Sequence, residues 1–315
     1  MNMKTAKNIA LKVVMLLTIL NVILAFTGCS RETASAGGED ATPSLKIGIM
    51  PAVDSAPILL ADKKGLFEKL GLNMDIQLYT NAMNRQSALQ SGELDGAMTD
   101  VIALVNNVGN GFDIRVTTCT DGVFPFLIKK DSVEKKDIKA GMTEVSVTNY
   151  LTDRFLSEKY KVDKVYIDEI PARLEMVAKG TLDMAVVPEP MASSGELNGL
   201  TKKLIGNTDK FSPDVMVFTG KVIKNKEKAL KLFHQAYNLA VDEINKDDGE
   251  ARDILIESLK LKSGTRDMII MPSYNRATIP SREYLQGILD WNAKTLGIKL
   301  DVKYEDLVEG KFAQQ

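Results

Sequence analysis

Short apolar segments alternate with amphipathic stretches from residue 45 onward. Apolar or alternating segments typical of strands are followed each time by a helical pattern, with small residues or glycine at the helix ends. Strands are predicted over 45–50, 74–79, 96–99 and 114–119, with helices over 56–64, 82–90 and 101–108 between them. Strands that alternate with helices in this way form parallel sheets.

The same order restarts after an extended segment and a charged stretch over 130–139. Strands are predicted over 144–147, 164–167 and 184–187, with helices over 149–159 and 172–179. A strand over 214–219 then leads back, and long helices follow it. We therefore expect two lobes, each a mixed and mainly parallel sheet flanked by helices. The expected first lobe comprises 45–125 and 219–315, and the expected second lobe comprises 126–218.

The N-terminus has the pattern of an export signal. Three lysines precede an apolar run over 13–26, which is too short to cross a bilayer core of about 30 Å comfortably. Thr27 and Gly28 lead into Cys29, and the segment resembles a bacterial lipobox. We expect a lipoprotein signal peptide over 1–28 and a lipid anchor, such as palmitate, on Cys29. An uncleaved membrane anchor is the alternative interpretation.

The segment after Cys29 is polar and built of small residues, so 29–44 is expected to be a flexible tether. Two acyl chains would anchor it stably, which places the protein outside the cytoplasm at the bacterial membrane.

Composition excludes several classes of function. The chain has 40 basic and 42 acidic residues, and the acidic excess argues against nucleic acid, whose phosphates need a basic face. Cys119 is the only cysteine besides Cys29 and ends an apolar segment, which indicates a packed residue. His234 is the only histidine and has no metal-ligand pattern around it. We expect no cofactor, no metal site and no catalytic triad.

Four segments resemble a known family when their order and spacing are considered together. They are PAVDSAPILLADKKGLFEKLGLNMDIQLY (51–79), NRQSALQSGELDGAMTD (84–100), AGMTEVSVTNYLTDRFL (140–156) and PARLEMVAKGTLDMAVVPEPMA (171–192). This pattern is similar to solute-binding proteins of the nitrate, sulfonate, taurine and thiamine-precursor importers. The resemblance covers roughly residues 45–315.

The resemblance implies a periplasmic-binding-protein-like fold of type II and a non-catalytic role. Two lobes would close on a small-molecule solute, and the closed form would dock on the permease subunits of an ABC importer and their ATPase. A monomer is expected.

Candidate ligand-binding residues lie where strands end and helices begin, because ligands of open α/β sheets bind there. They are Asp54, Ser55, Ala56, Thr99, Asp100, Thr120, Thr148, Asn149 and Glu189. Helix capping or a plain turn is the alternative for most of them. The resemblance implies ligand contact at the helix that opens with Thr148 and Asn149. Arg85 is interpreted as a surface charge.

Carboxylates around the expected cleft favour a neutral or cationic solute that is rich in hydrogen-bond donors, such as an amino-heterocycle or vitamin precursor. Asp54, Asp100, Asp121 and Glu189 would repel an anion unless each is neutralised by a helix N-terminus. An anion such as a sulfonate or nitrate is therefore the alternative within the family.

Three other classes of function would each leave a signature. A pyrimidine-precursor synthase on the same fold would carry a cysteine-rich signature, which this sequence lacks. A sensor domain would need a DNA-binding helix pair or a downstream membrane segment. A scaffolding lipoprotein would show no stabilisation by solutes.

Overall fold

The computed structural model describes residues 42–130, 135–206 and 213–313. The predicted signal peptide, the anchor at Cys29 and most of the predicted tether lie outside these ranges. Among the described helices, none combines the length and the apolar character that a membrane span requires.

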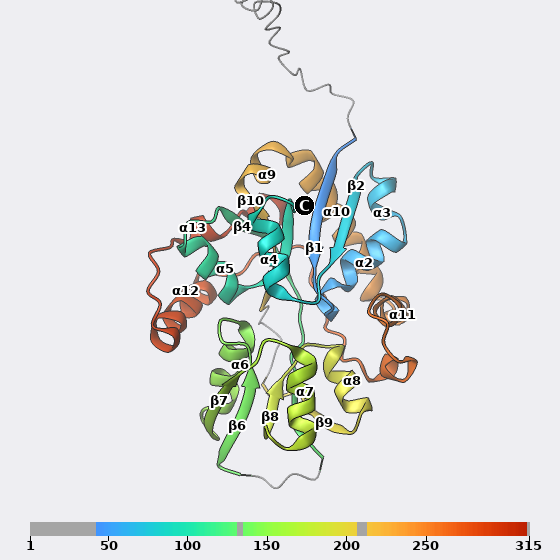
Figure 1. Ribbon diagram of the computed structural model, residues 1–315. Coiled ribbons are helices and arrows are strands. Elements are labelled where there is room, and N and C mark those ends of the chain that lie inside the picture. Colours follow the sequence, from blue (N-terminus) through green and yellow to red (C-terminus); the bar gives the residue numbers. More distant parts are fainter. Residues whose placement is uncertain (1–41, 131–134, 207–212, 314–315) are drawn as a thin grey trace, which may run out of the picture. The chain divides into compact units, whose positions relative to one another are not determined.

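The first lobe is built on a five-stranded sheet in the order β2-β1-β3-β10-β4 (Figure 1). β1 is parallel to both β2 and β3, whereas β10 is antiparallel to β3 and β4. The strands are β1 (Ser44–Ile49), β2 (Asn73–Leu78), β3 (Gly96–Asp100), β4 (Ile114–Thr120) and β10 (Asp214–Thr219). Gly96 permits the approach of β3 to β10, because a Cβ there would lie 2.4 Å from the Phe218 ring.

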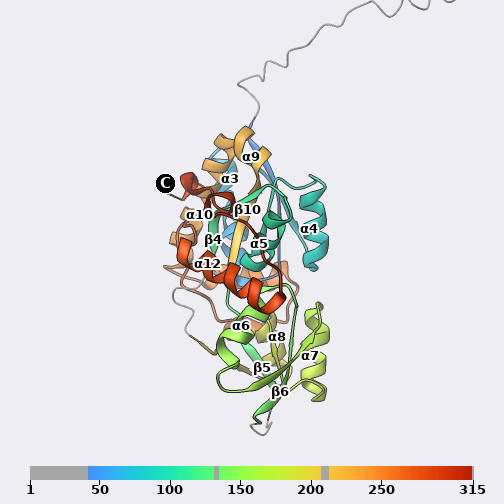
Figure 2. The same cartoon turned by 90° about the vertical axis from the view of Figure 1, so that its left-hand side faces the viewer.

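Helices cover both faces of this sheet (Figures 1 and 2). One apolar cluster joins the inner side chains of β1 to η1 (Val53–Ser55), α2 (Ala56–Lys63), α3 (Leu66–Lys69), α10 (Glu227–Ile244) and α11 (Gly249–Ser258). The other face carries α4 (Ala82–Gln90), α5 (Val101–Gly109), α12 (Arg282–Trp291) and α13 (Tyr304–Leu307). The remaining elements are α9 (Gly220–Asn225), η2 (Ser263–Met268), η3 (Asn292–Leu296) and η4 (Gly310–Phe312).

The second sheet repeats this topology in the order β7-β6-β8-β5-β9. β6 is parallel to β7 and β8, and β5 is antiparallel to β8 and β9. Its strands are β5 (Phe126–Lys129), β6 (Asp137–Met142), β7 (Lys161–Tyr166), β8 (Met184–Val186) and β9 (Leu200–Lys203), and its helices are α6 (Val147–Leu156), α7 (Ile170–Lys179) and α8 (Met191–Leu197). Two mixed sheets flanked by helices confirm the predicted fold class.

Two predicted boundaries need correction. The strand expected over 144–147 is absent, and that segment leads into α6; the strand is β6, which begins at Asp137. The chain also returns to the first sheet at Asp214, where β10 begins, five residues before the return expected at 219.

Candidate ligand-binding site

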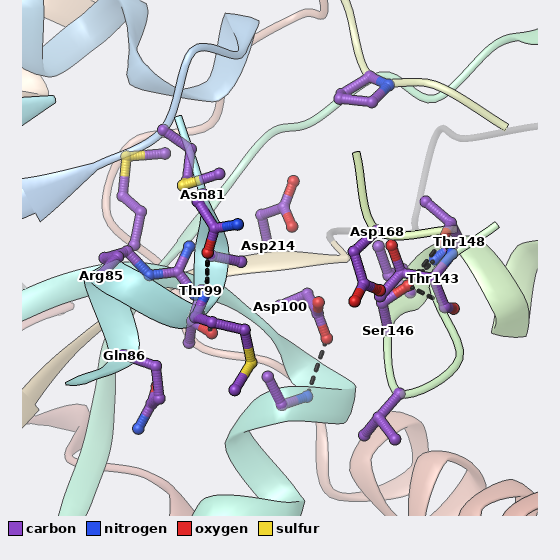
Figure 3. Close-up of a pocket in the computed structure, with 18 of the residues that line it drawn as sticks. Asn81, Arg85, Gln86, Thr99, Asp100, Thr143, Ser146, Thr148, Asp168 and Asp214 are labelled. Atoms are coloured by element: carbon purple, nitrogen blue, oxygen red, sulfur yellow. Dashed lines mark hydrogen bonds between the residues drawn. The ribbon is translucent and has the colours of Figure 1, made fainter. Parts of the chain in front are cut away.

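A cavity of about 450 Å³ is lined by residues from both lobes. Residues that follow β1 and β3 line it together with the first turns of α4, α6 and α7. Figure 3 shows Arg85, Thr99, Asp100 and Asp214 on one side, and Thr143, Ser146, Thr148 and Asp168 on the other. The cavity thus lies where strand ends and helix N-termini meet, which is the usual place for a ligand in α/β folds.

Strand pairing gathers three carboxylates at the first-lobe side of the cavity. In the sheet register, Asp214 lies opposite Asp100 on β3 and opposite Thr120 on β4. Asp54 comes from η1, and its Oδ2 accepts a hydrogen bond from the Thr120 hydroxyl at 3.3 Å. Arg85 enters from α4 with only 5% of its surface exposed. Its Nη2 donates to Thr99 Oγ1 at 3.1 Å.

Burial dominates the titration of these groups. It raises the pKa of Asp54 to about 7, against the lowering effects of the Thr120 hydrogen bond and the Arg85 charge. The pKa of Asp214 is raised well above its usual value by burial and then by the charges of Asp54 and Asp100. Burial lowers the pKa of Arg85, although the three carboxylates oppose this effect. Burial therefore favours the protonated forms of Asp54 and Asp214 more than water would.

Two backbone N–H groups hold the Asp100 carboxylate. As the N-cap of α5, its Oδ1 accepts hydrogen bonds from the N–H groups of Ile102 and Ala103, both at 2.9 Å. Burial raises its pKa, and these two N–H groups, Arg85 and the N–H of Val147 in α6 lower it. Asp100 is therefore a helix cap, which is one of the two roles that the sequence left open for it.

The second lobe contributes the start of α6. Ser146 caps this helix by accepting from the N–H of Thr148 at 3.1 Å, and the two hydroxyl oxygens lie 2.6 Å apart. The Thr148 hydroxyl also accepts from the N–H of Thr143 at 3.1 Å. Hydroxyls on a fixed turn can present both donors and acceptors to a small molecule.

α7 contributes a second buried arginine. Arg173 is 3% exposed, and its Nη1 donates to the Val186 carbonyl at 2.8 Å. Burial lowers its pKa to about 10, against the opposing charges of Asp168 and Glu169. Both acids line the same cavity.

Arg173 is the counterpart of Arg85, 88 residues earlier in the chain. Each arginine lies in the helix between the second and third parallel strands of its sheet. Each passes a glycine of the middle one of the three parallel strands, β1 or β6, since a Cβ on Gly48 would meet Arg85 Cγ at 3.1 Å and one on Gly141 would meet Arg173 Cγ at 3.6 Å. The two helix N-caps are also equivalent, and Asn81 Nδ2 donates to Glu169 Oε1 at 3.0 Å. The two lobes thus face each other through equivalent helices.

The structure brings four of the residues predicted from sequence to the cavity: Asp54, Thr99, Asp100 and Thr148. It places four others in the interior beside it. Ser55 donates to the Ala52 carbonyl at 2.7 Å, Ala56 is fully buried at the start of α2, and Asn149 donates to the Glu144 carbonyl at 2.7 Å. Thr120 is next to the site, since its hydroxyl donates to Asp54 and its backbone pairs with Asp214.

Glu189 is not placed at the cavity. Its carboxylate is fully buried and accepts from Lys202 Nζ at 2.8 Å, the Ser193 hydroxyl at 2.7 Å and the Ile270 N–H at 3.2 Å. These donors hold it inside the protein, away from the cavity where the sequence predicted a ligand group.

Sequence reasoning missed several cavity residues, and five of them have ionisable side chains: Arg85, Asp168, Glu169, Arg173 and Asp214. Arg85 is buried and not the surface charge that was expected. Its aliphatic stem packs over Gly48, a contact that only the sheet geometry reveals. Asp214 begins a strand that pairs antiparallel with β3, which places it at the edge where β3 ends, and only this pairing reveals its position.

Known proteins share this fold. Over 87% of this chain and 98% of the other, the structure superposes on the ligand-binding component of an ABC-type import system from Staphylococcus aureus, solved with zinc bound (TM-score 0.74, 19% identity). Over 86% and 95%, it superposes on the periplasmic aliphatic sulphonate binding protein SsuA from Escherichia coli (TM-score 0.66, 17% identity). Both confirm the predicted periplasmic-binding-protein fold.

Sequence comparison gives a short curated match and a long family match. A 55-residue segment is 31% identical to the nitrate import ATP-binding protein NrtC of Synechococcus elongatus, covering 18% of this chain and 8% of that protein. The model of the NMT1-like family matches residues 38–258, which is most of the chain. The chain therefore belongs to the NMT1-like family.

Proposed function

We propose that this protein is the extracytoplasmic solute-binding component of an ABC importer. The observation that carries the proposal is a cavity lined by equivalent helix N-termini of two lobes that share one topology. A solute that touches both lobes stabilises their closed arrangement by its differential affinity for it. The family and the fold of the S. aureus and E. coli proteins support the same role. No turnover is expected.

The balance of charge favours a neutral or cationic solute that is rich in N–H or O–H donors, such as an amino-heterocycle or vitamin precursor. Five carboxyl side chains line the cavity, Asp54, Asp100, Asp168, Glu169 and Asp214, against the two arginines Arg85 and Arg173. An anion would have to approach more acids than bases in a partly desolvated site.

An anionic solute is the second candidate, because the Nε atoms of both buried arginines have no hydrogen-bond partner. Buried guanidinium groups with spare donors are suited to a sulfonate or nitrate. Each arginine, however, has carboxylates beside it that reduce its attraction for an anion.

Native mass spectrometry of the purified chain, followed by thermal-shift measurements, tests the proposal. Aminopyrimidines, amines, aliphatic sulfonates and nitrate would be compared at equal concentrations. A specific solute at about 1,000 times its dissociation constant adds roughly 4 kcal/mol to the free energy of unfolding. Stabilisation by sulfonates or nitrate alone would select the anionic candidate. Stabilisation by none, with no co-purified small molecule, would contradict the importer role.

Anchoring at the membrane is a separate part of the proposal. The apolar run over 13–26 and Cys29 support export and acylation, which would keep a monomeric binding protein near its permease. Mass spectrometry of the N-terminal peptide should find diacylated Cys29 as the first residue. A Cys29→Ala variant should be released from the membrane fraction. If the variant stays in the membrane fraction and residues 1–28 remain attached to the chain, the proposal is contradicted.

A further inference from the structure

We propose that Asp54 and Asp214 hold one proton between them in the empty cavity, and that a cationic N–H donor of the solute displaces it on binding. The inference rests on the proposed solute-binding function and specifies the chemistry that the first lobe recognises. Capture of the solute would then release a proton, and affinity would depend on pH.

The Asp54 carboxyl is incompletely satisfied. The residue is 3% exposed and lines the cavity. Oδ2 accepts from the Thr120 hydroxyl at 3.3 Å, whereas Oδ1 is buried and has no hydrogen-bond partner. A desolvated carboxylate oxygen without a donor is costly, so this oxygen requires either a proton or a donor on the ligand.

The Asp214 carboxyl is the immediate neighbour. Thr120 lies next to both carboxyls, because its hydroxyl donates to Asp54 Oδ2 at 3.3 Å and its backbone is paired with Asp214 across the sheet. The glycine at position 122 leaves room for the Asp214 carboxyl, because a Cβ there would lie 2.3 Å from Asp214 Oδ2. The charge of Asp54 raises the pKa of Asp214, and two neighbouring buried carboxyls can share a proton, as do the paired acids of aspartic proteases.

None of the other charged or titratable groups around Asp54 and Asp214 supplies a positive charge that would make the shared proton unnecessary. Arg85 is the cation near it, but the same guanidinium also faces Asp100 and donates to Thr99. Asp121 is held by two hydrogen bonds from Asn275, and the Tyr274 hydroxyl donates to the Val53 carbonyl. Burial raises the pKa of Tyr237, so its phenol stays neutral. Across the cavity, Asp168 and Glu169 add negative charge beside Arg173.

An organic cation fits this site better than a metal ion. Across residues 42–130, 135–206 and 213–313, no three His, Cys, Asp or Glu side chains are grouped so as to hold a metal. An amidinium or protonated aminopyrimidine group presents N–H donors that can satisfy Asp54 Oδ1 and ionise the pair. The exchange is balanced, since one positive charge enters as one proton leaves. The pKa of Asp54, raised to about 7, places the exchange near neutral pH.

The linkage has a definite sign. Below the apparent pKa of the pair, the solute must expel the proton, so affinity rises by up to tenfold per pH unit. Above it, affinity is constant. An acceptor or anionic solute would keep the proton, and its affinity would fall as pH rises.

A carboxyl ¹³C NMR titration of the empty chain tests the shared proton without any solute. The Asp54–Asp214 pair should titrate in two separated steps, at least one of them near or above pH 7. Asp214→Asn should leave one step, and the exposed control Asp163→Asn should leave both steps in place. Ionisation of both carboxyls by pH 5 overturns the inference, and the wild-type titration decides this even if Asp214→Asn does not fold.

Acetamidinium and acetate serve as matched probes of charge. Acetamidinium should raise the melting temperature more at pH 8 than at pH 5.5, acetate should not, and Asp54→Asn should abolish the effect. No stabilisation by acetamidinium, or equal stabilisation at both pH values, overturns the inference. A solute found by mass spectrometry that binds without proton release would leave the importer role standing and remove only the proton exchange.

Discussion

Buried charge serves two purposes in this chain, and Glu189 and Asp54 illustrate them. Glu189 is fully buried but receives donors from Lys202, Ser193 and Ile270, so its charge is compensated within the protein. Asp54 is almost as buried, yet one of its oxygens has no donor. A compensated buried charge depends on its partner, since removing that partner destabilises the fold, whereas an uncompensated charge in a cavity is available for a ligand.

Replacing Glu189 with alanine should destabilise the protein, because the Lys202 side chain is only 6% exposed and would keep only the partly exposed Glu196 as an acidic partner. Loss of one partner of a buried pair costs about 3–5 kcal/mol. Urea denaturation would measure this loss, and Lys202→Met in the same chain should restore part of it. Glu175→Ala is the matched control, since its pair with Lys179 is exposed and should matter little. Equal stability of Glu189→Ala and wild type would contradict this role.

Part of the site could be predicted from single residues. Asp54, Thr99, Asp100 and Thr148 lie at strand ends or helix starts, and local sequence is enough to place them there. Glu189 has the same local pattern, but Lys202, which compensates it, comes from β9, an element that the sequence did not reveal. Asp214 required the register of an antiparallel pair more than 100 residues apart in sequence, which local patterns do not contain.

At the scale of elements, β6 shows why one strand was misplaced. Ile138, Ala140 and Met142 are buried, while Asp137 and Lys139 are exposed at the open end of the strand. Those two charges made the segment look like a linker. The segment over 144–147 has residues that favour strands, but Ser146 caps α6 there instead. The capping hydrogen bond therefore outweighs the strand propensity of this segment.

The N-cap of α6 should matter for both stability and binding. Ser146→Ala removes the acceptor for the Thr148 N–H, which costs about 1 kcal/mol. Solute affinity should fall as well, because both residues line the cavity.

Ser281→Ala is the matched control. Ser281 caps α12 by accepting from the N–H of Tyr284 at 3.1 Å and is not among the residues lining the cavity. It should show a similar loss in thermal denaturation with unchanged affinity in calorimetry. An equal loss of solute affinity in both variants would mean that reduced stability of the protein, and not a lost contact in the cavity, causes the loss.

At the scale of the whole described chain, the two lobes meet at several separate contacts. Asn81 bonds Glu169 between equivalent helix starts. Trp291 donates to Asp153 at 2.9 Å and packs edge-on against Tyr150, with ring centroids 5.4 Å apart. These contacts join the N-cap of α4 to the N-cap of α7, and α12 to α6. A change in the angle between the lobes must therefore alter them, which suits a protein that closes on a solute.

The most direct test is a crystal structure of the chain bound to the solute that native mass spectrometry identifies. The solute should lie in the cavity, with a donor within hydrogen-bond distance of Asp54 or Asp214 from the first lobe and a contact to Thr148 or Arg173 from the second. A solute bound to one lobe alone, or at another surface, would contradict the proposal that the lobes capture it between them.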